Sequence, residues 1–363
     1  MAVWQNDVDE RMRRHYERYP YPKYSVLGSI RRQDSYVFNL QALWAHFNGR
    51  LLESRGPERI LLAGSGSFLP YPVSVANPGR RVDALDLSQK SLARARIHAL
   101  RHLRFNLDYL VGDLMTPEIA PGPYHYIDSF GVLHCIPDFV EALRALERRL
   151  VEGGILRVMV YSRDGRAEVE RVRALCSELG VGSPRDIRRL ARKDELVRSC
   201  LAGSFEMGFD EGIADALLIP FARTFVVDEL LEALSGTSLR LVRFCHQGAL
   251  PALPAELARI RSLEKTRSFP TNLSFYVQRG GETPEPKRAY IVVNPGLRSM
   301  MSFPSPGSAY LPSKFGPENP VIDGELRGFL RRFLRPVDMV SLGPIDRAQA
   351  SALLDRLILI SYS

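Results

Sequence analysis

The stretch from Arg59 to Tyr161 alternates short apolar runs with helical segments, and this alternation limits the fold more than any other feature. Two segments, Ser88–His102 and Asp138–Leu150, have helical spacing and begin with a residue that can cap a helix. Strands that alternate with helices predict an open, mostly parallel sheet with helices on both faces, a doubly wound α/β fold. The runs with the length and apolar content of strands are Ile60–Ala63, Val82–Leu85, Leu107–Val111, Tyr126–Phe130 and Ile155–Tyr161.

After Tyr161 the alternation stops, and residues 163–226 are mostly helical in pattern, including Glu168–Leu179 and Arg185–Cys200. This segment predicts a helical insertion within one domain. The alternation then resumes with a helix over Val227–Leu234, and with two more strands, Leu239–Phe244 and Asn272–Gln278, which bring the predicted sheet to seven strands.

The two ends differ from this central part, so we divide the chain into residues 1–57, 58–280 and 287–363. The first part is a polar, aromatic leader, followed by an amphipathic helix over Val37–Ser54. Residues 280–286 have the composition of a linker. The last part predicts a small α+β module, either separate or packed on the main domain, whose helix–helix–strand pattern resembles a winged helix.

Composition favours a globular protein and excludes two classes. The N-terminus is polar and the apolar stretches are short, which argues against a membrane span and a secretory signal. The cysteines Cys135, Cys176, Cys200 and Cys245 have neither paired nor metal-ligand spacing, so we expect no disulfides, no metal and a cytoplasmic setting. The formal charge is +8, and many arginines alternate with acidic residues on helices, so a nucleic-acid partner is left open but not favoured.

The turn after the first strand reads Ala63-Gly64-Ser65-Gly66, and its glycines let the backbone turn tightly and approach a ligand closely. Asp86 ends the second strand, twenty residues beyond Gly66, followed by Leu87. A carboxylate at that strand tip can grip a ribose diol, which suits an adenosine-containing cofactor, although it can also begin a turn.

Two residues past the third strand distinguish between cofactors. Asp113 can accept from an adenine amino group, and Leu114 can cover the ring. A dinucleotide-binding turn carries a third glycine, and this chain has Leu69 at that position.

The ordered segments ILLAGSGSF, VDALDLS, GDL, GVLHCIPD and GGILRVMVYS, over residues 59–162, resemble the motifs of class I S-adenosylmethionine (SAM)-dependent methyltransferases. The resemblance implies a Rossmann-like fold, SAM as cofactor and S-adenosylhomocysteine (SAH) as product. It also implies a cofactor site at Ala63, Gly64, Ser65, Gly66, Asp86, Leu87, Asp113, Leu114 and Gly131.

The leader sequence YERYPYPK, over residues 16–23, is similar to that of a bacterial subgroup with an aromatic-proline leader. That similarity implies a leader folded over the cofactor; the alternative is a polyproline-like arm on the surface. The chain departs from the family where Leu62 and Ala63 replace an acidic residue and Phe68 replaces a glycine. These departures leave a non-catalytic SAM-binding interaction protein open.

His134 lies just past the fourth strand, where it can take a proton from an acceptor or line the pocket; the alternative is a histidine satisfied by backbone groups. Tyr161 is a second candidate. Methyl transfer depends chiefly on alignment, so a base is optional. We therefore expect a methyltransferase acting on O or N of a small molecule or protein, with the insertion as a lid. An RNA methyltransferase or RNA-binding protein is the alternative, and a homodimer is left open.

Overall fold

The computed structural model describes residues 2–53, 58–280, 289–302 and 307–363. Its main sheet has the strand order β3-β2-β1-β4-β5-β8-β7, with a short strand β6 beside β5. Strands β1 to β5 are parallel along this order, and β8 runs antiparallel to both of its neighbours. The predicted mostly parallel α/β sheet is therefore confirmed. The strands are β1 Arg59–Ala63, β2 Arg81–Asp86, β3 Leu107–Val111, β4 Tyr124–Phe130, β5 Leu150–Ser162, β6 Thr224–Phe225, β7 Leu239–Phe244 and β8 Leu273–Arg279.

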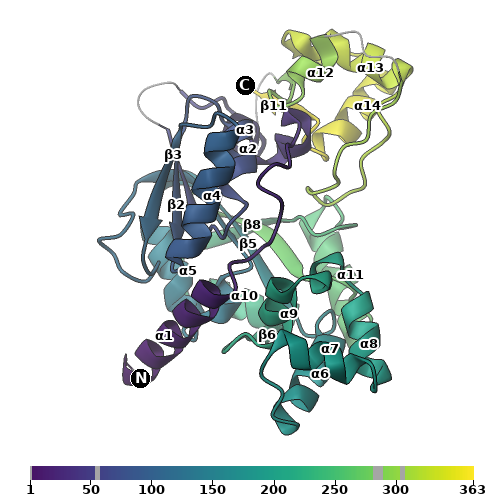
Figure 1. The fold of residues 1–363 in the computed structure, drawn as a ribbon. Coiled ribbons are helices and arrows are strands. Elements are labelled where there is room, and N and C mark those ends of the chain that lie inside the picture. Colours follow the sequence, from purple (N-terminus) through teal and green to yellow (C-terminus); the bar gives the residue numbers. More distant parts are fainter. Residues whose placement is uncertain (1, 54–57, 281–288, 303–306) are drawn as a thin grey trace.

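Helices cover both faces of this sheet (Figure 1). In β1 the side chains of Ile60 and Leu62 face one core, while those of Leu61 and Ala63 face the other, as the period of two in a strand requires. The caps expected at Ser88 and Asp138 are present. The helices on the two faces are α2 Leu40–Asn48 and α3 Pro70–Ala76 on the first, and α5 Phe139–Arg148, α10 Val227–Ser235 and α11 Leu253–Lys265 on the second, with α4 Gln89–Arg101 beside β2 and β3.

The insertion is a small helical bundle with its own buried cluster, which includes Val172, Ile187 and Ile213. The helix expected over residues 185–200 is instead two helices, because Asp194 accepts from the backbone N–H of Val197 and starts a new one. The helices of the insertion are α6 Ala167–Glu178, α7 Pro184–Ala191, α8 Glu195–Ala202 and α9 Asp210–Leu217, with a 3-10 turn η3 at Phe205–Gly208.

The N-terminal part differs from expectation in two ways. A helix, α1 Ala2–Arg18, precedes the aromatic-proline segment, and it packs against α4. The helix expected over residues 37–54 begins at Leu40, after a 3-10 segment η1 Arg32–Phe38, and ends at Asn48. It ends there because Gly49, at φ +63°, caps it in the left-handed conformation.

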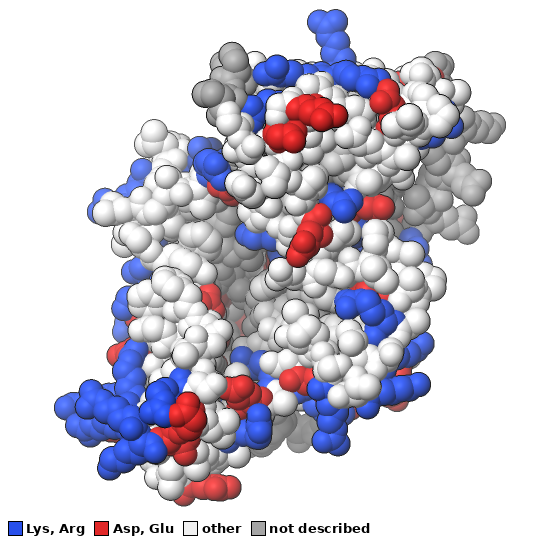
Figure 2. All heavy atoms as spheres, turned by 90° about the vertical axis from the view of Figure 1, so that its right-hand side faces the viewer, with Lys and Arg blue, Asp and Glu red and all other residues white. Residues whose placement is uncertain are grey.

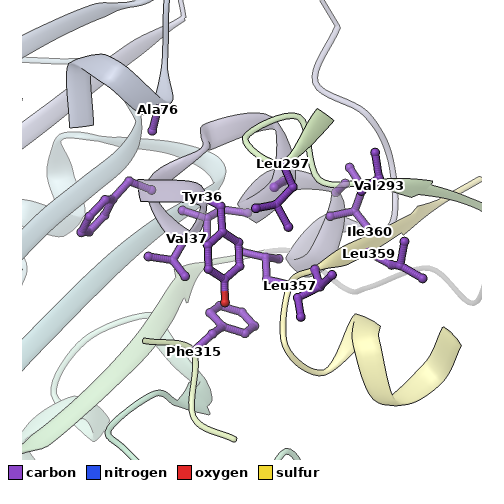
Figure 3. Close-up of a cluster of buried hydrophobic side chains, with 14 of the residues drawn as sticks. Tyr36, Val37, Ala76, Val293, Leu297, Phe315, Leu357, Leu359 and Ile360 are labelled. Atoms are coloured by element: carbon purple, nitrogen blue, oxygen red, sulfur yellow. The ribbon is translucent and has the colours of Figure 1, made fainter. Parts of the chain in front are cut away.

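The C-terminal part packs on the main domain and shares its core. Figure 3 shows Tyr36 of η1 with its ring directed at Phe315, among apolar side chains of the tail. The Tyr36 hydroxyl also donates to the backbone oxygen of Arg356 at 3.1 Å. The expected linker lies almost wholly outside the described residues, and the winged-helix likeness stays a prediction. The tail has a sheet of order β10-β9-β11, made of β9 Tyr290–Val293, β10 Val337–Asp338 and β11 Leu359–Tyr362, with helices α12 Arg298–Ser302, α13 Gly324–Arg331 and α14 Pro344–Leu354 and 3-10 turns at Arg332–Leu334 and Met339–Ser341.

Three properties of the described residues concern membranes, cysteines and metals. No helix among them is long and apolar enough to cross a bilayer. The four cysteines are buried thiols. No group of three or more His, Cys, Asp or Glu side chains in the described ranges is arranged to hold a metal ion.

Candidate functional site

The glycine-rich turn after β1 is held against the end of β2. The N–H groups of Gly64 and Ser65 both donate to the backbone oxygen of Leu85 at 2.9 Å. Gly64 has φ +76°, and a Cβ there would lie 2.3 Å from a methyl carbon of Val132. Gly66 has φ +58°. Position 64 requires glycine for two reasons: its backbone is left-handed, and Val132 leaves no room for a Cβ.

Asp86 is fixed at the tip of β2 by two backbone donors. One carboxylate oxygen accepts from the N–H of Gly66 at 2.8 Å, and the other accepts from the N–H of Ser88 at 2.9 Å. Burial raises the pKa of Asp86 to about 6, against the lowering effect of these two bonds. Each oxygen keeps a further lone pair, so the carboxylate can still accept from a diol.

The other predicted cofactor residues lie around the same edge of the sheet. The Asp113 carboxylate accepts from the N–H of Met115 at 2.8 Å, and burial raises its pKa. Leu114 is buried in the core cluster that also contains Ala63. Gly131, at φ +83°, donates its N–H to Met159. Leu87 packs beside α1, and Ser65 is buried in the turn.

His134 is a buried imidazole at the end of β4, with 1% of its surface exposed. Its ring lies over Tyr161 with centroids 3.7 Å apart. A backbone hydrogen bond with Met159 acts to raise its pKa, and no side chain among the described residues bonds to either ring nitrogen. Burial, with a contribution from Arg166, lowers the pKa of His134 to about 3. The contact with the Met159 backbone fits the expected alternative, an imidazole satisfied by backbone groups. At neutral pH the ring is uncharged and weakly basic.

The leader contacts the glycine-rich turn directly. The backbone oxygen of Tyr21 accepts from the N–H of Ser67 at 3.0 Å, and the Ser67 hydroxyl donates to the oxygen of Pro22. A Cβ on Gly66 would lie 2.8 Å from that Tyr21 oxygen. All four N–H groups from Gly64 to Ser67 therefore have protein acceptors, and one of these acceptors belongs to the leader.

The leader also bonds to the insertion through tyrosines and carboxylates, which the sequence analysis did not foresee. The Tyr16 hydroxyl donates to Asp215 at 2.9 Å. The hydroxyls of Tyr21 and Tyr24 both donate to Glu206. A nearby ion pair joins Lys23 to Glu211 at 2.6 Å. The available signal was the concentration of tyrosines in the leader, but nothing in it identifies their partners nearly two hundred residues away.

Burial also perturbs Asp215. Its side chain is 9% exposed, and burial raises its pKa to about 6, with the Tyr16 bond and Arg166 acting in the opposite direction. Arg166 itself lies over the ring of Tyr161, 3.7 Å from the centroid, and donates to the backbone oxygen of Ala216. Acidic, aromatic and imidazole groups therefore gather between the leader, the insertion and the carboxyl ends of the strands.

Comparison with known proteins agrees with this geometry. The family described as "Methyltransferase domain" matches residues 61–156. An uncharacterised protein of Synechococcus sp., syc1184_c, is 26% identical over 262 residues, which are 67% of this chain and 61% of that protein. The match thus spans less than two thirds of the relative's length.

The solved structures of PKMT2 from Rickettsia typhi are similar in fold. One has a TM-score of 0.57 at 12% identity and covers 95% of this chain and 78% of that one. The other, in complex with AdoHcy, has a TM-score of 0.55 at 13% identity and covers 91% and 76%.

The strand order of the main sheet and the likeness to PKMT2 show a class I methyltransferase fold, as the motifs predicted. The segment that matches the methyltransferase family model, residues 61–156, holds all the predicted cofactor positions.

Proposed function

We propose that the chain is a SAM-dependent methyltransferase that transfers a methyl group to O or N of a small-molecule or protein acceptor. The observation that carries the proposal is Asp86, fixed at the tip of β2 by the N–H groups of Gly66 and Ser88. A carboxylate held there beside a glycine-rich turn is suited to a ribose. The family match over the same segment and the AdoHcy bound in PKMT2 support this cofactor.

The residues present fit the nucleoside part of SAM. Asp86 would hold the ribose, and Asp113 with Leu114 would hold the adenine. Asp86 ends β2, and the other two residues follow β3; since these strands are parallel neighbours, all three residues lie at the same edge of the sheet. SAM would supply a methyl group on a sulfonium, which an aligned nucleophile can displace. The amino-acid end of SAM fits less simply, because the four N–H groups of the turn are already bonded within the protein.

This fit suggests that the leader covers the cofactor and moves when it binds. Among the acceptors of the four N–H groups of the turn, the Tyr21 oxygen is the one that the leader provides, so it is the one that a cofactor carboxylate can replace without disturbing the sheet. The insertion, bonded to the leader, would then act as the lid that excludes water around the acceptor.

Titration calorimetry with SAM and with SAH tests the proposal. We expect both to bind the wild-type protein, and Asp86→Ala to weaken both at least tenfold, on the order of 1.4 kcal/mol. Asp108→Ala is the matched control, because this carboxylate lies on the neighbouring strand β3 with 48% of its side chain exposed and should leave binding unchanged. If neither ligand bound the wild type, the cofactor assignment would be wrong.

The two alternatives predict different results. A non-catalytic SAM-binding protein, which the altered first turn favours, would bind both ligands and transfer no methyl group to any acceptor. An RNA-directed protein needs a basic face, and Figure 2 shows positive and negative side chains interspersed on the face that it presents. That alternative predicts RNA binding that weakens steeply with salt.

A further inference from the structure

Two carboxylates of the insertion are held by tyrosines of the leader rather than by cations. Asp215 accepts from Tyr16, and Glu206 accepts from Tyr21 and Tyr24. Among the described residues, no Lys, Arg or His nitrogen forms an ion pair with Asp215 or Glu206. A carboxylate taken out of water without a counter-ion is costly, so the buried Asp215, and to a lesser degree the half-buried Glu206, favours a positively charged ligand.

Aromatic rings surround the outer carboxylate. A small hollow between the leader and the insertion, with a volume of about 10 Å³, has Glu206 in its lining together with Tyr21, Tyr24, Phe205 and Phe209. Phe205 is 78% exposed, and its ring packs edge-on against that of Phe209. Rings around a carboxylate are the surroundings that an organic ammonium ion prefers, because the ring faces are electron-rich.

The inner carboxylate shares a neighbour, Arg166, with a buried imidazole, because Arg166 acts electrostatically on both His134 and Asp215. His134 is buried and stacks on Tyr161, and among the described residues only the backbone of Met159 acts on its ring as a hydrogen-bond partner. A neutral imidazole has two ring nitrogens, so one backbone partner leaves the other nitrogen able to bond to a ligand.

The charges around Asp215 come from several elements. Arg166, the cation that acts on Asp215, donates its hydrogen bond to the backbone oxygen of Ala216 and stacks on Tyr161, so it does not pair with the carboxylate. Lys23 is paired with Glu211. The groups that act on Asp215, or on the tyrosine bonded to it, are Tyr16, Tyr21, Cys135, Tyr161, Arg166 and Glu206.

We propose that the methyl acceptor is an amine, which enters as its ammonium ion past the aromatic hollow at Glu206 and is held by Asp215 beside Tyr161 and His134. The inference rests on the proposed function, since it names the acceptor class of that same site. It also gives the leader a role in specificity, because three of its tyrosines position the two carboxylates.

Asp215 is the group placed to take up the proton that an ammonium must lose before it can react. The N–H bond breaks, its electron pair stays on nitrogen, and the proton moves to the carboxylate oxygen. The free amine then has the lone pair that methyl transfer requires, and Asp215 later returns the proton to solvent. The raised pKa of Asp215 makes this carboxylate a stronger base than an ordinary aspartate.

Calorimetry with n-butylammonium chloride tests the inference, with n-butanol as the uncharged analogue of similar shape. We expect n-butylammonium to bind the wild type at least tenfold more tightly than n-butanol, with or without SAH. Asp215→Asn and Glu206→Gln should each weaken the binding of n-butylammonium at least tenfold and leave the binding of SAH unchanged. Asp210→Asn, on the same helix but 59% exposed, is the matched control and should change neither.

The outcomes separate this inference from the proposed function. Equal binding of n-butylammonium and n-butanol, or unchanged n-butylammonium binding to Asp215→Asn, overturns the amine site even where SAH binds. If Asp215→Asn weakened the binding of SAM but not of SAH, the carboxylate would interact with the sulfonium of the cofactor, and the inference would also be wrong. Ammonium binding without any SAH binding contradicts the proposed function, and the acceptor role fails with it even though the ammonium site is present. In the wild type, binding should weaken as the pH falls below 6, and this dependence should be absent in Asp215→Asn.

Discussion

The hydroxyl of Tyr16 donates to the carboxylate of Asp215 at 2.9 Å across 199 residues of sequence. The backbone oxygen of Tyr16 meanwhile accepts from the hydroxyl of Ser88, two residues beyond Asp86. A single leader residue therefore joins the tip of β2 to the insertion. This double attachment makes the leader a structural part of the site.

Removing that hydroxyl should weaken the folded state. Tyr16→Phe keeps the ring but leaves a buried carboxylate without its donor, so we expect the free energy of unfolding to fall by about 1–2 kcal/mol. Urea unfolding at pH 7.5 measures this. Tyr19→Phe is the control, since no hydrogen bond of its hydroxyl is found among the described residues. Equal stability of Tyr16→Phe and Tyr19→Phe would contradict the role given to the bond.

The burial of Asp215 predicts a pH-dependent stability. Its pKa is raised from 3.8 to about 6, so the folded state binds more protons than the unfolded state between these values. The stability from this group is therefore fully present below pH 3.8 and is lost as the pH rises through 6. Asp215→Asn carries no charge there, so it should be roughly 1–3 kcal/mol more stable than the wild type at pH 7.5 and equal near pH 4. Unfolding at both pH values checks this; a variant less stable at pH 7.5 would refute it.

Two glycines allow a matched test of how the leader contacts the turn. Gly66 and Gly79 both have positive φ, but a Cβ on Gly66 meets the Tyr21 oxygen, whereas a Cβ on Gly79 meets nothing within 4 Å. Both alanine variants should lose about 1 kcal/mol from backbone strain. Gly66→Ala should in addition free the leader, seen as trypsin cleavage at Lys23 several-fold faster than in Gly79→Ala. Identical cleavage rates would mean that the leader is held by other contacts.

The shared core predicts that the C-terminal part unfolds together with the main domain. Phe315, which contacts Phe47 and Tyr276 of the main domain, is 1% exposed. Phe315→Ala should lower the free energy of unfolding by about 3–5 kcal/mol while leaving a single transition. Phe105→Ala, at a 75% exposed position, should change it by about 0.5 kcal/mol or less. Two separate transitions would show that the C-terminal part is independent.

The sheet and the residues along its carboxyl edge could be predicted because their signals are local. Strand β3 was placed at its observed bounds, Leu107–Val111, and the caps at Ser88 and Asp138 follow from the residue types alone. Asp86 could be placed at the strand tip for the same reason. Each of these depends on neighbours within a few positions in the chain.

The remaining features depend on contacts between distant segments. Helix α1 has a polar composition, and it was missed because its few apolar residues, such as Val8 and Met12, pack on Ile219 of the insertion. The carboxylates Glu206 and Asp215 could not be assigned, because an acidic residue on a helix is normally solvated. The requirement for glycine at Gly66 was assigned to the cofactor, but the structure adds a contact with the leader.

The packing of Tyr36 against a segment some 320 residues further along has a consequence for how the chain is made. Helix α2 packs partly on the main sheet, where Trp44 contacts His125 of β4, and partly on β11, which is synthesised after the whole main sheet. On the ribosome the part of α2 that faces β11 therefore stays uncovered while most of the protein emerges. Such a delay makes the nascent chain dependent on chaperones that shield apolar surface, and it makes release from them a late step in reaching the native state.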